Sequence, residues 1–450
     1  MEAASGTFAT KGGREAARRE QLGAAFWLLV VYFAFEYLRL QTIIAPLGPL
    51  RIPLLLTLLL PIVWFFVADK SVLKDGLIVL HATFIGLIAA SVTWAANQYW
   101  VFQTFKLMVA YLIAATLPLA SFLVTRRRLT VFFNIWIVFH VLIALWAVTH
   151  EGRGTGSFLD DENDLSLALN MAIPYAYYLL QRPGQSWLLR LFYIGAVAVM
   201  VAGIVASGSR GGFLGLMAVF LGIILFSRNR IRNLIVVACI GLIGLAVVSE
   251  QYIEEMHTIT DSQDLTRIDR FYSWRRGWEM FLDHPLVGVG ASNYPWRVVE
   301  YEVRSPEYRP GRVRLHGGRV AHSLYFTVIP EFGLAGIALF SAIVWILFRR
   351  LFALVRLDSR QPERFAEAVE LPLLARAMIV SLFGFLVSGA FISVLYYPHL
   401  WVLIGFAIGL ITTVSALPAG VQSAQRDGAQ AGFFERHRQQ WQQKPQTRGR

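Results

Sequence analysis

Charged residues are scarce in this chain of 450 residues. Asp, Glu, Lys and Arg make up only 16% of it, whereas soluble domains average about 25%. Hydrophobic residues account for 56%. Most of them lie in apolar runs of about 20 residues, each long enough to cross the roughly 30 Å hydrocarbon core of a bilayer as a helix. The composition therefore excludes a soluble globular domain and predicts an all-α polytopic membrane protein.

Several signatures of soluble enzymes are missing as well. The single cysteine, Cys239, lies in an apolar run, so no intrachain disulfide can form. There is no HExxH, no Cys/His spacing typical of a zinc site, and no GKS or GKT of a nucleotide-binding P-loop. The net charge of +12 is explained by where the basic residues lie and does not indicate nucleic acid. We therefore expect no metal, no cofactor and no nucleic-acid partner.

The apolar runs predict about twelve membrane spans. The sequence shows no internal repeat and no cleavage site before the first run, so we expect an uncleaved start. One polar stretch of about 70 residues, ending at Val320, interrupts the series. The spans are expected near residues 22–38, 49–68, 76–95, 100–121, 129–149, 163–181, 187–207, 211–227, 233–250, 321–347, 371–395 and 398–417.

Lys and Arg are distributed unequally between the connections of these spans. If both termini are cytoplasmic, the inner segments hold about 25 basic residues and the short outer connections about four. The positive-inside rule then places the long polar loop on the outer side. The expected organisation is a cytoplasmic N-terminus (1–21), nine spans (22–250), a large outer loop (251–320), three spans (321–417) and a disordered cytoplasmic tail (418–450).

The segment SGSRGGFLG, Ser207 to Gly215, joins two spans by a very short turn. Its glycines allow tight backbone geometry and the close approach of a ligand. Arg210 is thereby held at the outer boundary of the membrane, where its guanidinium can donate two parallel hydrogen bonds to a phosphate. A snorkelling interfacial arginine beside a glycine turn explains the residue equally well.

The long outer loop carries aromatic residues and arginines on the stretch from Arg267 to Trp296. Trp274, Trp278 and Phe281 fall at i, i+4 and i+7, which predicts an amphipathic helix packed on the membrane surface or on the roof of the bundle. The later half of the loop forms either a solvated face or a contact with anionic sugars and lipid phosphates. It contains six arginines: Arg297, Arg304, Arg309, Arg312, Arg314 and Arg319.

His322 stands where the long loop meets a span. It is followed by Ser323, nine further residues, Gly333, two residues and Gly336. An imidazole at such a junction can titrate where water and lipid-linked groups meet. A lone histidine at a helix start is more often a cap or a hydrogen-bonded structural residue, so both interpretations stay open at this point.

The acidic residues near these segments favour structural roles. Glu331 lies nine residues beyond His322, roughly 13 Å deeper along a helix that rises 1.5 Å per residue. A carboxylate at that depth is costly and is usually functional or paired, and Lys106 and Arg376 are possible partners for a structural pairing. Four further acids precede a span and are expected to start that helix rather than to coordinate a divalent cation: Asp160, Asp161, Glu162 and Asp164.

Four stretches in this order resemble the O-antigen ligase and polymerase superfamily of bacterial envelope proteins. GSFLDDENDLSLAL, which contains Asn163, is similar to the family's pattern of glycine, aromatic and asparagine-leucine before a span. SGSRGGFLG is similar to its serine-arginine-glycine turn. Arg270, Trp274 and the later HPLVGVG match an arginine four residues before a tryptophan, then a proline and a GxG. His322 and Ser323 open the ligase signature, with serine where asparagine is common.

The resemblance implies an all-helical membrane glycosyltransferase of the C type, with about twelve transmembrane helices and one long periplasmic loop. It further implies an O-antigen ligase in the bacterial inner membrane, with its active site facing the periplasm. The donor would be a glycan on undecaprenyl pyrophosphate and the acceptor a sugar hydroxyl of the lipid A core. His322 matches the family's proposed base, while Arg210 and Arg270 match arginines implicated in donor binding. Secondary candidates are Asn163, Ser323, Arg267 and Glu331.

Other functions fit parts of the sequence. An O-antigen polymerase would use another lipid-linked repeat as acceptor, and a protein-glycosylating branch of the superfamily uses Ser, Thr or Tyr hydroxyls. The histidine signature favours a ligase. A transporter of lipid-linked sugars would also have about twelve spans but would more often show two related halves. A non-catalytic envelope scaffold would not need Arg210, Arg270 and His322. The sequence leaves the sugars, the acceptor atom and the oligomeric state open.

Overall fold

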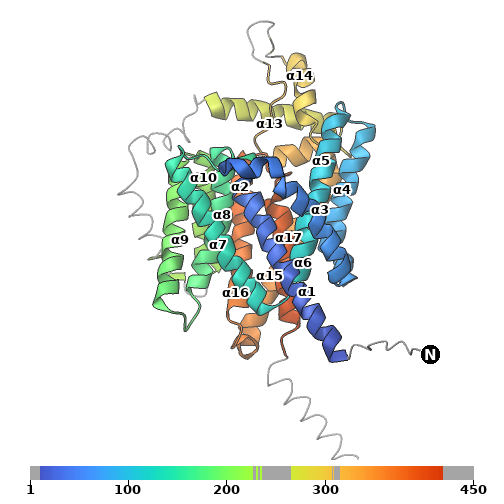
Figure 1. Ribbon diagram of the computed structural model, residues 1–450. Helices are drawn as coiled ribbons and strands as arrows, with labels where there is room; N and C mark the ends of the chain where they lie inside the picture. Colours follow the sequence, from blue (N-terminus) through green and yellow to red (C-terminus); the bar gives the residue numbers. More distant parts are fainter. Residues whose placement is uncertain are drawn as a thin grey trace, which may run out of the picture.

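The computed structural model describes residues 11–226, 230–231, 234–235, 265–306, 308 and 315–418, and this part of the chain is helical without a strand (Figure 1). The predicted span at 233–250, the loop residues 251–264 and 309–314, and the predicted tail beyond residue 418 lie outside the described residues. The helices are α1 (Lys11–Tyr37), α2 (Leu40–Ile43), α3 (Ile52–Val67), α4 (Gly76–Ala90), α5 (Gln98–Ala110), α6 (Leu117–Phe122), α7 (Arg126–Thr149), α8 (Glu162–Leu180), α9 (Trp187–Ala206), α10 (Arg210–Phe226), α13 (Leu265–Asp283), α14 (Tyr294–Arg304), α15 (Tyr325–Arg360), α16 (Glu370–Ser388) and α17 (Pro398–Ser415).

Seven of the described helices are long and apolar enough to cross a membrane, and three shorter apolar helices accompany them. The limits predicted at 129–149 and 187–207 agree closely with α7 and α9, whereas α15 extends to Arg360, beyond the predicted span at 321–347. α8 occupies the span expected at 163–181. The prediction of an all-helical polytopic membrane protein is therefore confirmed. The number twelve stays a prediction, because the span at 233–250 lies outside the described residues.

The helices run between two ends of the bundle, and the basic connections gather at one of them (Figure 1). At this end Arg126 bonds to Glu370, which Arg182 also approaches at 3.8 Å. Arg350 Nη1 donates to both carboxylate oxygens of Asp75 at 2.8 and 2.6 Å. The connections rich in Lys and Arg are therefore joined to acidic residues of neighbouring helices. α13 and α14 lie across the opposite end, which we call the outer end (Figure 1).

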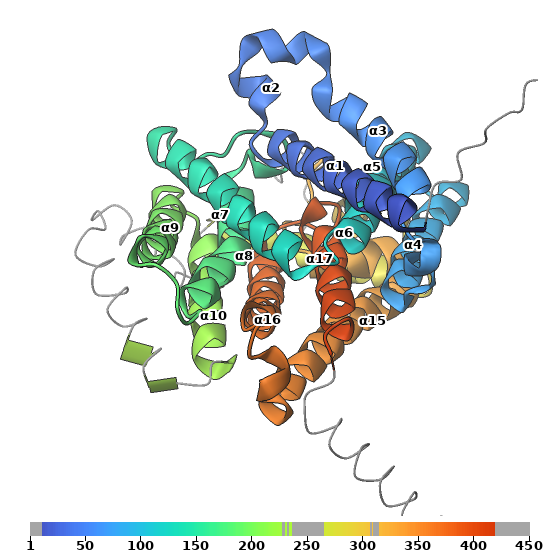
Figure 2. The same ribbon diagram turned by 60° about the horizontal axis from the view of Figure 1, so that its bottom comes forward.

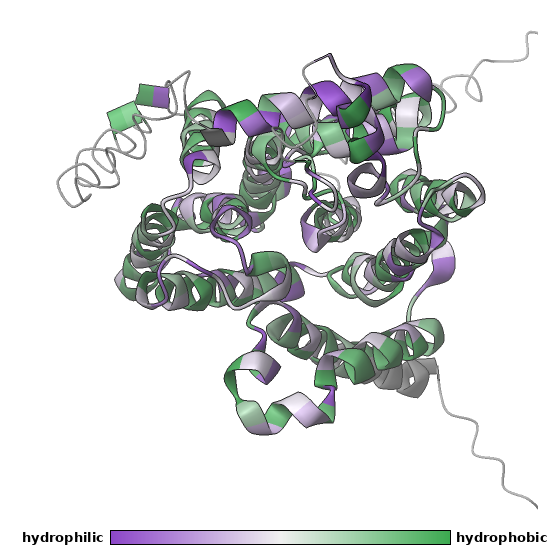
Figure 3. Cartoon of the chain, turned by 90° about the horizontal axis from the view of Figure 1, so that it is seen from above, coloured by the Kyte–Doolittle hydropathy of each residue, from purple (hydrophilic) through white to green (hydrophobic). Residues whose placement is uncertain are grey.

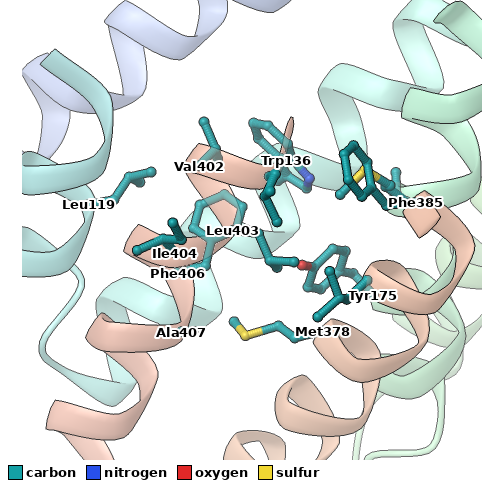
Figure 4. Packing of buried hydrophobic residues seen from close by; sticks show 14 of the residues in the cluster. Leu119, Trp136, Tyr175, Met378, Phe385, Val402, Leu403, Ile404, Phe406 and Ala407 are labelled. Carbon is teal, nitrogen blue, oxygen red and sulfur yellow. The ribbon is translucent and has the colours of Figure 1, made fainter. Parts of the chain in front are cut away.

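α8, α16 and α17 form the centre of the bundle. In α16 and α17, 83% of the apolar window is buried, compared with 33% in α9, which identifies α9 as peripheral. α1 and α3 pack side by side at one edge (Figure 2). In the interior, Trp136 of α7 meets Phe406 of α17 with ring centroids 5.3 Å apart (Figure 4). Such edge-to-face aromatic contacts bury large apolar surfaces and fix the relative positions of the helices.

The buried Arg376 of α16 pairs with Asp358 and not with Glu331. Arg376 Nη2 donates to Asp358 at 2.8 Å, and both side chains are nearly buried between α15 and α16. Lys106 is exposed, with its ammonium 5.2 Å from the ring of Phe102. The expectation that one of these cations pairs with Glu331 is therefore wrong. The sequence alone could not reveal that Asp358, far along α15, takes Arg376.

The predicted amphipathic helix of the outer loop forms as α13, but Trp274, Trp278 and Phe281 do not share a buried face. Trp278 is 48% exposed, whereas Arg276 is 1% exposed. Arg276 Nη1 donates to the Tyr301 carbonyl at 3.1 Å, which satisfies part of its buried guanidinium. α13 thus turns a cation inward, an arrangement that hydrophobic periodicity cannot anticipate. Seen from above, hydrophilic residues concentrate along α13 and α14 (Figure 3).

Candidate active site

α15 is broken near its outer end. At Gly333 the backbone adopts φ 57° and ψ −150°, a conformation that is open essentially to glycine alone. The element therefore consists of a half-helix over residues 325–332 and a long helix over residues 334–360. A break leaves N–H and C=O groups without helical partners, and within a membrane protein other protein groups must satisfy them.

The loop after α13 supplies those partners. Two of its amides cap the carbonyl end of the half-helix, and two of its carbonyls accept from the first amides of the long helix. The four bonds measure 2.8–3.0 Å and join Val289 N to Pro330 O, Gly290 N to Glu331 O, Leu334 N to Pro285 O and Ala335 N to Leu286 O. We call residues 285–293 the strap. The HPLVGVG motif and the glycines after His322 are therefore two halves of one structural unit.

Glu331 fastens the strap from inside. Its side chain is buried, Oε2 accepts from the amide of Ser292 at 2.8 Å, and Oε1 accepts from the amide of Tyr294 at 3.2 Å. The hydroxyl of Tyr396 also donates to Oε2. The predicted pairing of Glu331 thus occurs, but with hydrogen-bond donors of the outer loop instead of a cation. The depth expected for Glu331 assumed a straight helix after His322. The helix is broken at Gly333, and the strap reaches the Glu331 carboxylate from the outer end.

The strap is also tied to the outer ends of α4 and α5. Asn293 Oδ1 accepts from the amide of Asn97 at 2.7 Å, and Nδ2 donates to the Asn97 carbonyl at 3.2 Å. The amide of Ala291 donates to Ser91 Oγ at 3.1 Å. The strap therefore joins α4, α5 and the broken α15 into one rigid platform below α13.

Trp274 links α13 to the residue before His322. Its indole Nε1 donates to the carbonyl of Ala321 at 2.9 Å, and its ring stacks on Phe326 with an interplanar angle of 3° and a centroid distance of 5.3 Å. Arg270 lies one helical turn before Trp274, on the same side of α13. This bond therefore brings the predicted donor-binding arginine into the electrostatic environment of His322.

His322 is exposed, in contrast to its neighbour Ser323, which is 1% exposed. Ser323 Oγ accepts from the amide of Phe326 at 3.3 Å and so caps the start of α15. The amide of Leu324 donates to the carbonyl of Gly389 at 2.7 Å, which fixes this turn against the connection between α16 and α17. His322 itself has a positive φ of 49°, a strained conformation for a residue other than glycine. The tertiary contacts of the turn hold it there.

Partial burial and neighbouring charges lower the pKa of His322. Partial burial is the largest cause, Arg270 lowers the pKa further by repelling the imidazolium, and Arg319 acts in the same direction. The carboxylate of Asp161 opposes them and raises the pKa. Because the ordinary pKa is near 6.5, the ring is neutral at pH 7 and can accept a proton.

The two other motifs meet at the start of α8 and α10. Ser209 Oγ donates to Asn163 Oδ1 at 2.7 Å, and Asn163 Nδ2 donates to Asp161 Oδ1 at 2.7 Å. Arg210 is the first residue of α10, directly after this bond, and Gly208 at φ 64° makes the tight turn before it. A Cβ placed on Gly211 would lie 3.6 Å from Asn163 and 3.3 Å from Phe391. The structure therefore brings together Asn163 and the turn that carries Arg210.

The acidic run before α8 starts that helix, as predicted. Asp161 is its N-cap, with the side chain accepting from the amide of Asn163 at 2.7 Å. Asp164 is buried and accepts from the hydroxyl of Tyr397 at 3.1 Å. Burial and the nearby Asp164 raise the pKa of Tyr397, so this hydroxyl remains a donor. No group of three or more His, Cys, Asp or Glu side chains in the described part of the chain is arranged to hold a metal ion.

Comparison with known families finds a match that covers most of these motifs. Residues 195–341 match the model of the O-antigen ligase family (Wzy_C). The chain carries an O-antigen ligase family domain. A search of curated proteins finds no match. The domain extends from within α9 to within α15, so it contains Arg210, Arg270, His322 and the strap.

The O-antigen ligase domain is completed by residues outside its matched limits. Asp161 and Asn163 come from the start of α8, and Tyr396 comes from the connection between α16 and α17. Sequence reasoning did not assign a role to Tyr396 or to the indole of Trp274. Trp274 had a signal, its fixed spacing from Arg270, whereas nothing near Tyr396 in the chain indicates Glu331.

Arg267 and Arg276 behave differently from Arg270. The guanidinium of Arg267 lies 5.7 Å from the ring centroid of Phe271, on the next turn of α13. Arg276 packs 4.9 Å from the ring centroid of Tyr272 and forms an ion pair with Glu279 at 2.9 Å. Arg276 is therefore a core residue of the outer layer, whereas its neighbour Arg275 is exposed.

Proposed function

We propose that this protein is an O-antigen ligase. It transfers a polysaccharide from undecaprenyl pyrophosphate to a sugar hydroxyl of the lipid A core, on the periplasmic side of the bacterial inner membrane. The outer end of the bundle faces the periplasm in this proposal, because the connections rich in Lys and Arg lie at the opposite end. The reaction is an inverting glycosyl transfer that uses neither a metal nor a nucleotide.

One observation carries the proposal within the O-antigen ligase domain. The bond from Trp274 to the Ala321 carbonyl brings the helix of Arg270 next to the exposed, neutral imidazole of His322. His322, as a base for a hydroxyl, and Arg270, as a cation for a phosphate, thus lie at one site. A transporter of lipid-linked sugars has no need of such a pair, which favours the enzyme.

The roles follow from the chemistry of the substrates. The acceptor hydroxyl attacks the anomeric carbon, its proton passes to His322, and the bond from that carbon to the pyrophosphate oxygen breaks. Arg210 and Arg270 hold the pyrophosphate and stabilise the charge that grows on it as it leaves. The energy of the reaction resides in the lipid-linked donor. Asn163 positions the turn of Arg210, and Ser323 and Glu331 position the turn of His322.

The decisive experiment replaces His322 by alanine in the purified, membrane-reconstituted protein. A positioned general base contributes about 10²- to 10⁴-fold, so transfer should fall by that factor while lipid-linked donor still binds. The wild-type protein should work in chelator without added nucleotide. Activity of His322→Ala within a few-fold of wild type contradicts the proposal. So does activity that disappears in EDTA and returns with one divalent ion.

A deletion strain distinguishes the ligase from a polymerase of the same superfamily. Loss of a ligase leaves free lipid-linked polymer and an unsubstituted lipid A core. Loss of a polymerase leaves single repeats attached to the core. A deletion that changes neither the lipid-linked polymer nor the lipid A core would instead favour the branch that glycosylates protein hydroxyls.

A further inference from the structure

α13 exposes four of its large apolar side chains. The residues buried against α14 and α15 are Ser273, Arg276, Gly277 and Met280, at the spacing i, i+3, i+4 and i+7. Four large apolar residues are exposed at i, i+3, i+10 and i+14, which is one stripe of a helix. They are Ile268, Phe271, Trp278 and Leu282, of which Leu282 is 60% exposed.

The strap and the long part of α15 also expose large apolar residues close to this stripe in the chain. Leu286, in the strap, is 67% exposed, and its carbonyl accepts from the amide of Ala335 at 3.0 Å. The neighbouring Leu334 is 51% exposed on a helix that is long and apolar enough to cross a membrane. The outer apolar strip is defined as Ile268, Phe271, Trp278, Leu282, Leu286 and Leu334, which are exposed apolar residues of α13, the strap and the start of the long part of α15.

The charges beside the strip suit a bilayer surface. Arg267 lies over the ring of Phe271, and the exposed Arg275 lies within the stripe, 3.6 Å from Glu279. Arginine stems pack along apolar surface while their guanidinium groups reach phosphates, and tryptophan is favoured at the boundary of headgroups and acyl chains. An apolar face with tryptophan, phenylalanine and leucine next to arginines is the pattern of a helix lying in the membrane interface.

We propose that the outer apolar strip is embedded among the phospholipid acyl chains of the leaflet at the outer end, so that α13 is a membrane-interface helix. This inference does not depend on the proposed ligase reaction. It places Arg270, on the same helix, at the level of lipid phosphates. This last step alone rests on the proposed function: lipid-linked pyrophosphate in that leaflet then approaches Arg270 laterally, without leaving the membrane.

The test uses the full-length protein with Cys239→Ala in liposomes. Single cysteines at Phe271 and Leu282 report on the strip, and cysteines at Asp269 and Asp283, which are exposed on the same helix, are the matched controls. Each carries a small fluorophore. We expect lipids brominated on their acyl chains to quench the labels at 271 and 282 several-fold more strongly than the controls. Iodide in the buffer should quench the control labels at 269 and 283 more strongly than the labels at 271 and 282.

Three results would overturn the proposal. Labels at 271 and 282 that respond to iodide as the controls do would place the strip in water. Labels shielded from both quenchers would mean that protein covers it. Quenching by bromolipid that disappears as the protein-to-lipid ratio rises would identify a second copy as the occupant. If Leu282→Cys lowers protein yield, Leu286→Cys tests the same strip.

Discussion

His322 shows how one neighbouring residue decides between two roles. A histidine at a helix start is often the cap, but here Ser323 Oγ accepts the first-turn amide of Phe326. The imidazole of His322 is consequently left exposed, between the cations Arg270 and Arg319 and the carboxylate of Asp161. Partial burial lowers the pKa of His322 most, and the charges of these three residues shift it further in directions that can be tested.

Replacing Arg319 or Asp161 should shift the acidic limb of the pH–rate profile in opposite directions. Arg319→Gln removes a cation that lowers the pKa of His322, so the pKa rises and the rate falls at a higher pH than in the wild type. Asp161→Asn removes the opposing carboxylate, so the pKa falls and activity persists to lower pH. The measurement is kcat/KM against pH. If the acidic limb of both variants coincides with that of the wild type, His322 is not the group that accepts the proton.

The arginines predict a second residue-level result. Arg210→Lys keeps the charge but loses the bidentate fork, so transfer should drop clearly. Arg270→Ala should do likewise at a normal level of protein in the membrane. Arg275→Ala is the matched control, because Arg275 is exposed on the same helix and lies 3.6 Å from Glu279. Near-full activity of both Arg210→Lys and Arg270→Ala would contradict the proposal that these two arginines hold the pyrophosphate.

At the scale of elements, the strap and the broken α15 depend on one another. The break exposes backbone groups, and the strap satisfies four of them while Glu331 ties three donors to one carboxylate. A Cβ on Gly288 would overlap the backbone of Glu331, so the two segments touch through their main chains. The half-helix that follows His322 is therefore positioned by the strap and not by the long helix.

Gly333→Ala should lower both protein yield and transfer. Alanine is strained at φ 57° and ψ −150°, at a cost of about 1–3 kcal/mol, and its Cβ would overlap the Pro285 carbonyl. Gly86→Ala is the control, because a Cβ there meets nothing within 4 Å in α4. The measurements are the yield of membrane-inserted protein and its melting temperature. Equal stability of the two variants would contradict the role given to the break.

Glu331→Gln should retain some transfer, and Glu331→Ala should lower protein yield. The carboxylate only accepts, whereas an amide turns one NH₂ group toward the amide of Ser292 or Tyr294 and loses a bond worth about 1–3 kcal/mol when buried. Alanine loses all three bonds. Yield and specific activity are measured separately. A fully inactive but well-folded Glu331→Gln would move Glu331 into the reaction itself.

For the whole molecule, two ends with different chemistry define the orientation. One end holds the ion pairs Arg350–Asp75 and Arg126–Glu370, and the other holds α13, α14 and the candidate site. We propose from the positive-inside rule that the first end lies in the cytoplasm. In this proposal the site opens to the periplasm, where the proposed acceptor is located.

Cysteine labelling tests this orientation directly. In a Cys239→Ala background, a cysteine next to Gly317 should react with an impermeant reagent in intact cells whose outer membrane is permeabilised. A cysteine next to Gly428 should react only after the inner membrane is opened. The reverse pattern would defeat the proposed mechanism as a whole, because His322 would then face the cytoplasm.

The sequence by itself determined the membrane class, the limits of most spans and the residues of the candidate site. These are local properties, since a run of apolar residues or a spaced motif such as His322–Gly333 is complete within one stretch of chain. Only the tertiary structure decided that α15 is broken, that Arg376 pairs with Asp358, and that Tyr396 binds Glu331. It also decided that the indole of Trp274 joins the Ala321 carbonyl and brings Arg270 to His322. These contacts connect segments far apart in the chain, and their partners are chosen by packing and by the need to satisfy buried polar groups.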